Sequence, residues 1–228
     1  NFVMEYGNYG YRDERTGADY RSRRTNMEST MQRRMWHQND PGVVPNLLIT
    51  GSGAPTGILV YEGALLPEAF RGQMIHAEPG RNIVWAFPAK QAGSGYSARI
   101  VNIARSTKDR NYRPSDVSVG PDGSLFIADW FDPVDCCHRT INDAGRIFRV
   151  APPGHAYTTP VHDYRAPAGA VRALRSPNLS TRYRAWAALQ AMGVHARPAL
   201  ETMASDNNPR LRARALWALA ALKDGSPG

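Results

Sequence analysis

Cysteine is scarce in this chain, which holds two cysteines among 228 residues. Cys136 and Cys137 are adjacent, so a framework of disulfides is excluded and with it a small disulfide-stabilised scaffold. They are free thiols or, in a strained alternative, a vicinal disulfide. The run Cys136-Cys137-His138 also lacks the two residues that separate the cysteines of a c-type haem attachment site, so this chain carries no such site there.

Long hydrophobic runs are missing too. No apolar stretch approaches the ~20 residues that a membrane-spanning helix needs, and no signal peptide is visible. The chain starts at Asn1 without an initiator methionine and stops at Gly228 after barely two helical repeats. We therefore expect a fragment of a larger protein, whose signal would lie upstream.

Lysine is scarce as well. The chain has only Lys90, Lys108 and Lys223, so arginine supplies most of the positive charge behind the formal net charge of +8. From Arg165 to Asp224 there are ten basic residues and three acidic ones, a net charge of +7. This segment either faces an anionic partner or is a solvated arginine-rich surface. Nucleic acid is not expected, because no stacking aromatics alternate with the arginines.

Short apolar segments bounded by Gly, Pro, Asn or Asp are abundant between residues 41 and 150, after a long polar N-terminal loop. This pattern is typical of all-β sandwiches, barrels and propellers. The segments are Val43–Ile49, Gly57–Tyr61, Met74–Ala77, Ile83–Phe87, Ala98–Ile103, Asp116–Val119, Leu125–Ala128 and Arg146–Val150.

The pair Asp122-Gly123 gives the strongest local signal. Glycine tolerates the positive φ that tight hairpin turns require, so the pair predicts a turn between strands at 116–119 and 125–128. Arg146–Val150 then adds a third antiparallel strand. A meander of this kind is the unit of a propeller blade.

The hydrophobic period becomes helical after a proline-rich linker. An internal repeat with an offset of thirty residues aligns Asn178, Arg182 and Leu189 with Asn208, Arg212 and Leu219. Alanine- and leucine-rich helices of this length must stack on one another to bury their apolar faces. We therefore predict a partial β-propeller over 1–152, a linker over 153–166 and HEAT-like helical repeats, an ARM-type fold, over 167–228.

Three stretches carry a family resemblance. They begin with Trp36-His37-Gln-Asn-Asp-Pro-Gly-Val-Val-Pro-Asn, continue with Ala54-Pro-Thr-Gly57-Ile-Leu-Val-Tyr-Glu-Gly, and end with Arg113-Pro-Ser-Asp-Val-Ser-Val-Gly-Pro-Asp-Gly-Ser-Leu-Phe-Ile-Ala-Asp-Trp. The chain resembles a family of membrane-bound dehydrogenases related to the soluble quinoprotein glucose/sorbosone dehydrogenases. The resemblance implies blades of a six-bladed, TolB-like propeller followed by a HEAT-like α-helical solenoid segment.

The same resemblance implies a function. Such proteins are similar to periplasmic enzymes that oxidise a sugar, alcohol or aldehyde and pass electrons to a c-type haem domain, which would lie outside this chain. The related enzymes use pyrroloquinoline quinone (PQQ) and calcium. A periplasmic or other extracytoplasmic location is therefore expected, with membrane association through segments outside this chain.

Five residues are candidates for catalysis and for holding the quinone. Hydride abstraction needs a base, for which His37 is the candidate, with Asp116 as a candidate catalytic carboxylate. The quinone carries three carboxylates, so its pocket needs fixed cations. Arg113 matches the first of two quinone-binding arginines of the related enzymes, and Arg146 is a second candidate cation. Glu78 is the third cofactor-binding candidate, and its alternative is a charge at a strand edge.

An oxygen-rich loop supplies the metal candidates Asp129, Asp132 and His138. Calcium takes six to eight oxygen ligands from such loops. Capping of turns by aspartate is the structural alternative, because these residues lack the regular spacing of an EF-hand. A soft metal held by Cys137 and His138 is a further alternative.

Two functions therefore compete. The first is a quinoprotein-like dehydrogenase acting on a sugar or related alcohol. The second is a non-catalytic propeller and HEAT scaffold that binds a carbohydrate or, through its helices, a protein. Both kinds of segment are common interaction platforms, and a fold does not fix a function.

Overall fold

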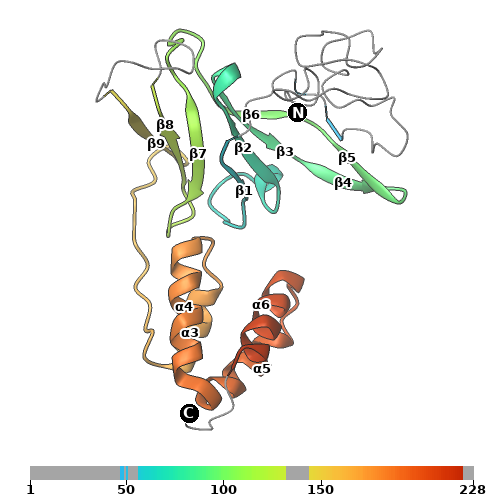
Figure 1. Ribbon diagram of the computed structural model, residues 1–228, viewed down its shortest axis with the longest axis vertical. Coiled ribbons are helices and arrows are strands. Elements are labelled where there is room, and N and C mark those ends of the chain that lie inside the picture. The colour runs from blue at the N-terminus through green and yellow to red at the C-terminus, as the bar shows by residue number, and fades with distance from the viewer. Residues whose placement is uncertain (1–46, 49, 51–55, 132–143, 223–228) are drawn as a thin grey trace, which may run out of the picture. The chain divides into compact units, whose positions relative to one another are not determined.

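The computed structural model describes residues 47–48, 50, 56–131 and 144–222 (Figure 1). In this part of the chain, nine strands precede four α-helices, and strands and helices hardly alternate. The strand pairs within residues 74–105 are antiparallel, and the described chain is a mainly antiparallel β structure with C-terminal helices. This agrees with the predicted order of β segments and helices. A closed six-bladed ring and a HEAT solenoid stay predictions.

The larger sheet has four strands in the order β1-β2-β3-β6. They are β1 (Ile58–Val60), β2 (Met74–Glu78), β3 (Ile83–Phe87) and β6 (Val101–Arg105). β3 is buried at all five positions, because both faces of the sheet are covered there. One face presents Val84 and Ala86, and the other presents Trp85, which packs edge-on to Phe87 with ring centroids 6.2 Å apart.

A ribbon of two strands, β4 (Ala89–Ala92) and β5 (Gly95–Ala98), connects β3 to β6. Its turn uses Gly93, whose φ of +59° suits glycine. The whole stretch from Ile83 to Arg105 is thus one long hairpin that leaves the sheet and returns to it. This ribbon gave no signal in the sequence, because its residues are exposed or half-buried and show no apolar alternation.

The second sheet is the meander β7-β8-β9, formed by β7 (Pro114–Val119), β8 (Leu125–Asp129) and β9 (Arg146–Val150). Gly123 has a φ of +89°, and its amide donates to the Gly120 carbonyl at 2.9 Å. The predicted turn at Asp122-Gly123 and the predicted third strand are therefore confirmed. Leu125 and Ile127 are fully buried, as expected for alternate positions of a strand.

The helices are α3 (Pro167–Leu174), α4 (Leu179–Met192), α5 (Arg197–Ala204) and α6 (Pro209–Ala220). α3 packs against α4 and α5 packs against α6, so the helices pair in chain order. Small side chains let them approach closely. Their shared core is formed by Ala170, Ala173, Leu174, Ala185, Leu189, Ala196, Leu200, Met203, Ala215, Ala218 and Leu222.

The thirty-residue repeat appears in the hydrogen bonds of the helices. Asn178 caps α4 by accepting from the Thr181 amide at 2.8 Å, and Asn208 caps α6 by accepting from the Arg210 amide at 3.0 Å. Arg182 donates to the carbonyls of residues 176 and 177, and Arg212 to those of residues 206 and 207. In both copies of the repeat, an asparagine therefore caps the second helix, α4 or α6, and an arginine binds the carbonyls just before it.

The chain divides into two compact units. The first contains the described residues of 1–59, 73–116 and 128–146, and the second those of 60–72, 117–127 and 147–228. The predicted domain boundaries at 152 and 166 stay predictions. None of the helices in the described residues is long and apolar enough to cross a bilayer.

Candidate functional site

Five of the eight residues singled out in the sequence fall in the described part of the chain. His37, Asp132 and His138 lie outside the described residues. Of the five, Arg113, Asp129 and Arg146 come together in the first unit, whereas Glu78 and Asp116 are in other contacts. Their proposed roles stay predictions, but their surroundings can be described.

Asp129, the last residue of β8, is the centre of a polar cluster that we call the Asp129 cluster, with Asp109, Arg113, Phe131 and Arg146. Its Oδ1 accepts from the main-chain amides of Arg113 at 2.7 Å and Phe131 at 3.0 Å. Its Oδ2 accepts from Arg146 Nε at 2.8 Å, and Arg146 Nη2 also donates to Asp109 Oδ2 at 2.7 Å. The cluster thereby joins the starts of β7 and β9 to the end of β8.

Burial and neighbouring charges shift the pKa values of two members of this cluster and of Tyr112 beside it. Burial, with the charge of Asp129 added, raises the pKa of Tyr112 to about 12. The hydrogen bond from Arg146 lowers the pKa of Asp109, and the bond to Asp109 raises the pKa of Arg146 although partial burial opposes it. All three groups therefore keep one protonation state around neutral pH, which suits a structural network better than acid–base catalysis.

The Asp129 cluster does not fit an acidic quinone. Arg146 already faces two carboxylates, and Arg113 Nη1 donates to the Arg110 carbonyl at 2.7 Å. Three carboxylates of a ligand would have to displace these bonds, and the buried charge of Asp129 would then lose its partner. We therefore derive no chemical step through PQQ at these residues.

The Asp129 cluster does not fit a metal ion either. Both carboxylate oxygens of Asp129 already accept hydrogen bonds from N–H donors. Over the described residues, no group of three or more His, Cys, Asp and Glu side chains lies close enough to hold a metal ion. Calcium wants six to eight oxygens, so the Asp129 cluster does not fit it.

Glu78 and Asp116 are held by close main-chain contacts. Glu78 is 1% exposed, and its carboxylate accepts from the Gly80 amide at 2.9 Å, which starts the short helix η2 (Pro79–Arg81). Asp116 on β7 lies against Gly57, whose amide donates to the Ser115 carbonyl at 3.1 Å. A Cβ on Gly57 would lie 1.9 Å from Asp116 Oδ1 and 2.6 Å from its Cα, so only glycine fits.

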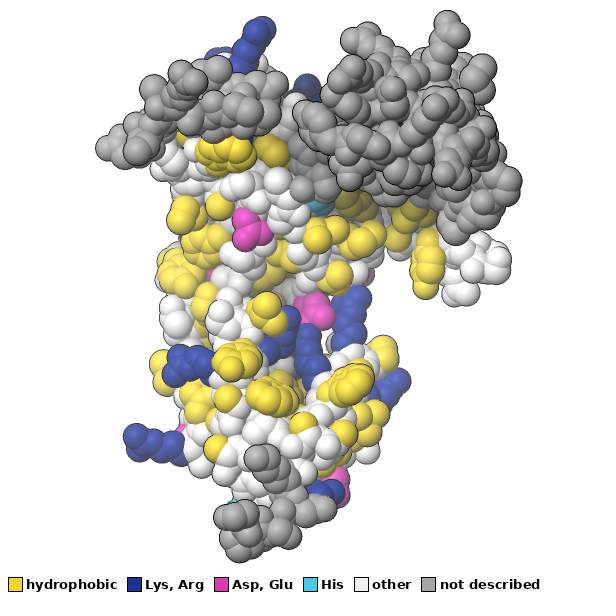
Figure 2. Space-filling view, viewed as in Figure 1, with side chains coloured by type: hydrophobic (Ala, Val, Ile, Leu, Met, Phe, Trp, Pro, Cys, Tyr) yellow, Lys and Arg dark blue, Asp and Glu magenta, His cyan; other side chains and the backbone are white. Residues whose placement is uncertain are grey.

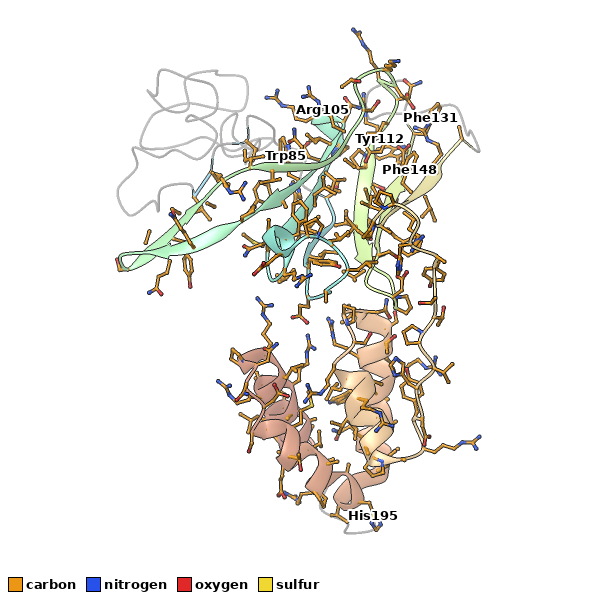
Figure 3. All side chains as sticks on the ribbon, turned by 180° about the vertical axis from the view of Figure 1, so that it is seen from behind. Trp85, Arg105, Tyr112, Phe131, Phe148 and His195 are labelled. Carbon is orange, nitrogen blue, oxygen red and sulfur yellow. The ribbon has the colours of Figure 1, made fainter. Side chains whose placement is uncertain are left out.

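A pocket of about 230 Å³ lies in the first unit, on the face of the larger sheet that carries Trp85. Figure 3 shows Trp85 and Arg105, two of its residues, on this sheet. We call it the Trp85 pocket. It combines an apolar wall with an amide, a hydroxyl and two guanidinium groups. It is lined by Thr50, Arg81, Ile83, Trp85, Asn102 and Arg105.

An irregularity in β6 builds one side of this pocket. In a regular strand, Asn102 and Arg105 would point to opposite faces, since they are three residues apart. The register shifts between Val84 and Trp85, so that Arg105 lies opposite Ile83 whereas Asn102 lies opposite Trp85. Both partners belong to one face of β3. The bulge therefore brings an amide and a guanidinium to the same pocket, a known use of such irregularities.

His76 on β2 is a candidate that the sequence analysis did not single out. It lies opposite Trp85 in the ladder, and its ring centroid is 6.1 Å from that of Phe87. Its Nε2 is buried and has no hydrogen-bond partner among the described residues. Burial lowers the pKa of His76, so the imidazole is neutral at pH 7. Its position between apolar residues gave no sequence signal.

The second unit has a polar network at the predicted turn. Asp122 is buried, and it accepts hydrogen bonds from Ser124, from Arg149 at 3.0 Å and from His155 at 3.2 Å. Burial opposes ionisation, but these hydrogen bonds together lower the pKa of Asp122 to about 2. The carboxylate therefore stays charged and ties the turn to β9 and to the segment that follows it.

These features define a class of protein: mainly antiparallel β structure with C-terminal helices. It has an ionic cluster whose charged groups bond to one another, and a small pocket with polar side chains. Within this class, the chain belongs to the family described as a domain of unknown function, DUF7133, whose model matches residues 8–154.

Other comparisons are more distant. A crystal structure of an oxidoreductase (glucose dehydrogenase) from Thermus thermophilus is 18% identical with a TM-score of 0.35. The alignment covers 49% of this chain and 29% of that chain, so the chain spans less than a third of that protein. A likeness at this score carries no argument about function. No curated protein matches the chain.

Proposed function

We propose that the described part of this chain is a binding module that holds a small sugar-like molecule in the Trp85 pocket. One observation carries the proposal: the pocket joins an indole and an aliphatic wall to an amide, a hydroxyl and guanidinium groups. A sugar offers C–H surface for an aromatic wall and hydroxyls for polar side chains. Small-molecule sites commonly combine an apolar lining with a few well-placed polar groups.

Size supports a small ligand. The pocket measures about 230 Å³. Drug-sized ligands occupy pockets of about 300–1,000 Å³. A single sugar ring suits this space better than a fused quinone of three rings.

Calorimetric titration of the full chain with D-glucose and D-glucuronate tests the proposal. We expect saturable binding of at least one of them and an affinity about five- to tenfold lower in Asn102→Ala, which loses one hydrogen-bonding side chain. Asn207→Ala is the matched control, because Asn207 is an exposed residue of the second unit. Absence of binding by both sugars, in a folded protein, would overturn the proposal.

The second candidate is a quinoprotein-like dehydrogenase that oxidises a sugar or related alcohol and passes electrons to a c-type haem domain outside this chain. The resemblance of residues 36–46, 54–63 and 113–130 to that group of enzymes favours it. Addition of PQQ and calcium, followed by absorbance and by reduction of a dye, is the test. Saturable quinone binding with dye reduction would support this candidate over a binding module. An extracytoplasmic location is proposed on the same resemblance.

A protein partner is proposed for the helices as HEAT-like repeats. Exposed aromatic side chains support it: Tyr183 is 67% exposed and Trp217 76% exposed. Tyr183 also stacks on Trp186, with ring centroids 6.2 Å apart. In Figure 2, hydrophobic and basic side chains lie beside one another over the helical part. Tryptophan, tyrosine and arginine are the residues that dominate binding at protein interfaces.

A further inference from the structure

We infer that the ligand of the Trp85 pocket is an acid, a monosaccharide that carries a carboxylate, held by Arg105 with Arg81 beside it. This inference rests on the proposed function and adds the charge of the ligand to it. Among the lining residues that the structure describes, two carry a positive charge and none carries a carboxylate. A neutral sugar needs no such excess of positive charge.

Main-chain hydrogen bonds fix the two arginines next to each other. Arg81 ends η2, and the next residue, Asn82, has a left-handed backbone with a φ of 56°. The Asn82 carbonyl accepts from the amide of Ser106 at 3.2 Å, and Ser106 directly follows Arg105. The side chain of Asn82 is also fixed, because it donates to the carbonyls of Arg110 and Tyr112. Hydrogen bonds therefore hold together the backbone segments that carry both arginines.

Arg105 is the cation on which the inference depends. Its guanidinium has no hydrogen bond or ion pair with the described residues, whereas Arg81 has a further interaction of its own. Guanidinium groups bind carboxylates through two parallel N–H···O bonds. Arg81 and Arg105 are exposed, but the pocket that they line also contains the buried side chains of Trp85, 7% exposed, and Ile83, which would shield one side of a bound carboxylate from water. A carboxylate at this end of the pocket therefore gains more than one in open water.

The remaining lining residues suit the rest of such a ligand. Asn102 offers one acceptor and two donors, so ring hydroxyls have partners of both kinds, and Thr50 lines the pocket with an interaction of its own. Sulfate and acetate share the anionic chemistry but lack the ring, so they separate a sugar acid from a simple oxyanion.

Titration of the full chain with D-glucuronate, D-glucose, acetate and sulfate tests this inference. We expect D-glucuronate to bind about 10- to 100-fold more tightly than D-glucose, as a charge-assisted pair contributes. The preference should shrink at least tenfold in Arg105→Gln, and added salt should weaken it. Arg99→Gln, at an exposed arginine that does not line the pocket, is the matched control and should keep the preference.

The outcomes separate the two proposals. Equal binding of D-glucose and D-glucuronate, unchanged in Arg105→Gln, overturns the acidic ligand but leaves the sugar-binding module standing. Binding of sulfate or acetate as tight as that of D-glucuronate also overturns the sugar acid. Binding of no sugar at all overturns both. Thermal unfolding of each variant shows whether it is folded, and Arg105→Lys tests whether paired guanidinium bonds matter more than charge alone.

Discussion

At the scale of single residues, the structure separates charged groups that stabilise the chain from groups that are free to bind. In the sequence, Asp129 was a candidate metal ligand and Asp122 part of a predicted turn, and each accepts hydrogen bonds from several N–H donors in the structure. The Arg146 guanidinium donates to two aspartates and that of Arg113 to a main-chain carbonyl, whereas that of Arg105 has no such bond among the described residues. Residue type alone could not have told these arginines apart, because the difference lies in what surrounds each one.

Replacement of Asp129 tests its structural role. Asp129→Asn keeps one oxygen for the two main-chain amides and replaces Oδ2, which accepts from Arg146, by an NH2 group. The Arg146 guanidinium then has one acceptor fewer. We expect the free energy of unfolding to fall by about 2–4 kcal/mol, as for a broken buried ion pair. Asp109→Asn is the matched control and should cost less, because the Asp109 side chain is 35% exposed and that of Asp129 is fully buried. Urea unfolding of both variants measures this, and equal losses would contradict it.

His76 makes stability depend on pH. Its pKa is lowered in the folded state, so below its ordinary value of 6.5 the unfolded chain takes up a proton that the folded chain does not. We therefore expect this residue's contribution to stability to be complete above about pH 6.5 and to be lost as the pH falls.

Thermal unfolding of wild type and His76→Gln between pH 5 and pH 8 measures this effect. The midpoint of the variant should fall less on acidification than that of the wild type. His195→Gln, at an exposed histidine of the second unit, is the control for replacing a histidine. Identical pH profiles for wild type and His76→Gln would show that the imidazole does not act in this way.

At the scale of elements, short sequence patterns were sufficient to predict the turns and strands that depend on residues close together in the chain. The turn at Gly123 and the strands around Ile83 and Leu125 follow from short-range patterns. The Trp85 pocket does not. Arg81 and Arg105 are brought together by the return of the long hairpin, and the bulge in β6 reverses the direction that strand alternation predicts for Asn102.

Gly57 is an element-scale test of the close approach of two main chains. Gly57→Ala places a methyl group against Asp116 Oδ1 and its Cα, so the backbone must shift. We expect a loss of about 1–3 kcal/mol in the free energy of unfolding, as for other overpacked sites. Gly95→Ala is the control, since the nearest atom to its Cβ is 4.0 Å away. Similar unfolding midpoints for both variants would contradict the packing of Gly57.

The two helix caps form a second matched pair. Asn208→Ala removes one capping bond and should cost about 1 kcal/mol. Asn178→Ala should cost about 2 kcal/mol, because its Nδ2 also donates to the Val119 carbonyl at 2.6 Å. Chemical unfolding followed by far-UV circular dichroism compares them. A larger loss for Asn208→Ala would contradict the assigned bonds.

At the scale of the whole chain, the DUF7133 family model covers residues 8–154, the part that contains all the strands of the described residues. The order of β segments followed by helices was readable because the hydrophobic period changes at the proline-rich segment. Catalytic roles were not readable, since they depend on groups that meet only in three dimensions. Arg113 and Arg146, expected to hold a quinone, both donate to Asp129 instead, whereas Glu78 accepts from the Gly80 amide.

Hydrogen–deuterium exchange of the full chain with and without D-glucuronate tests the central claim, that the Trp85 pocket is the binding site. We expect slower exchange in peptides that cover 81–85 and 101–105, and unchanged exchange in those that cover 113–119 and 125–131. Protection confined to the strands of the Asp129 cluster, or no protection at saturating ligand, would contradict the claim.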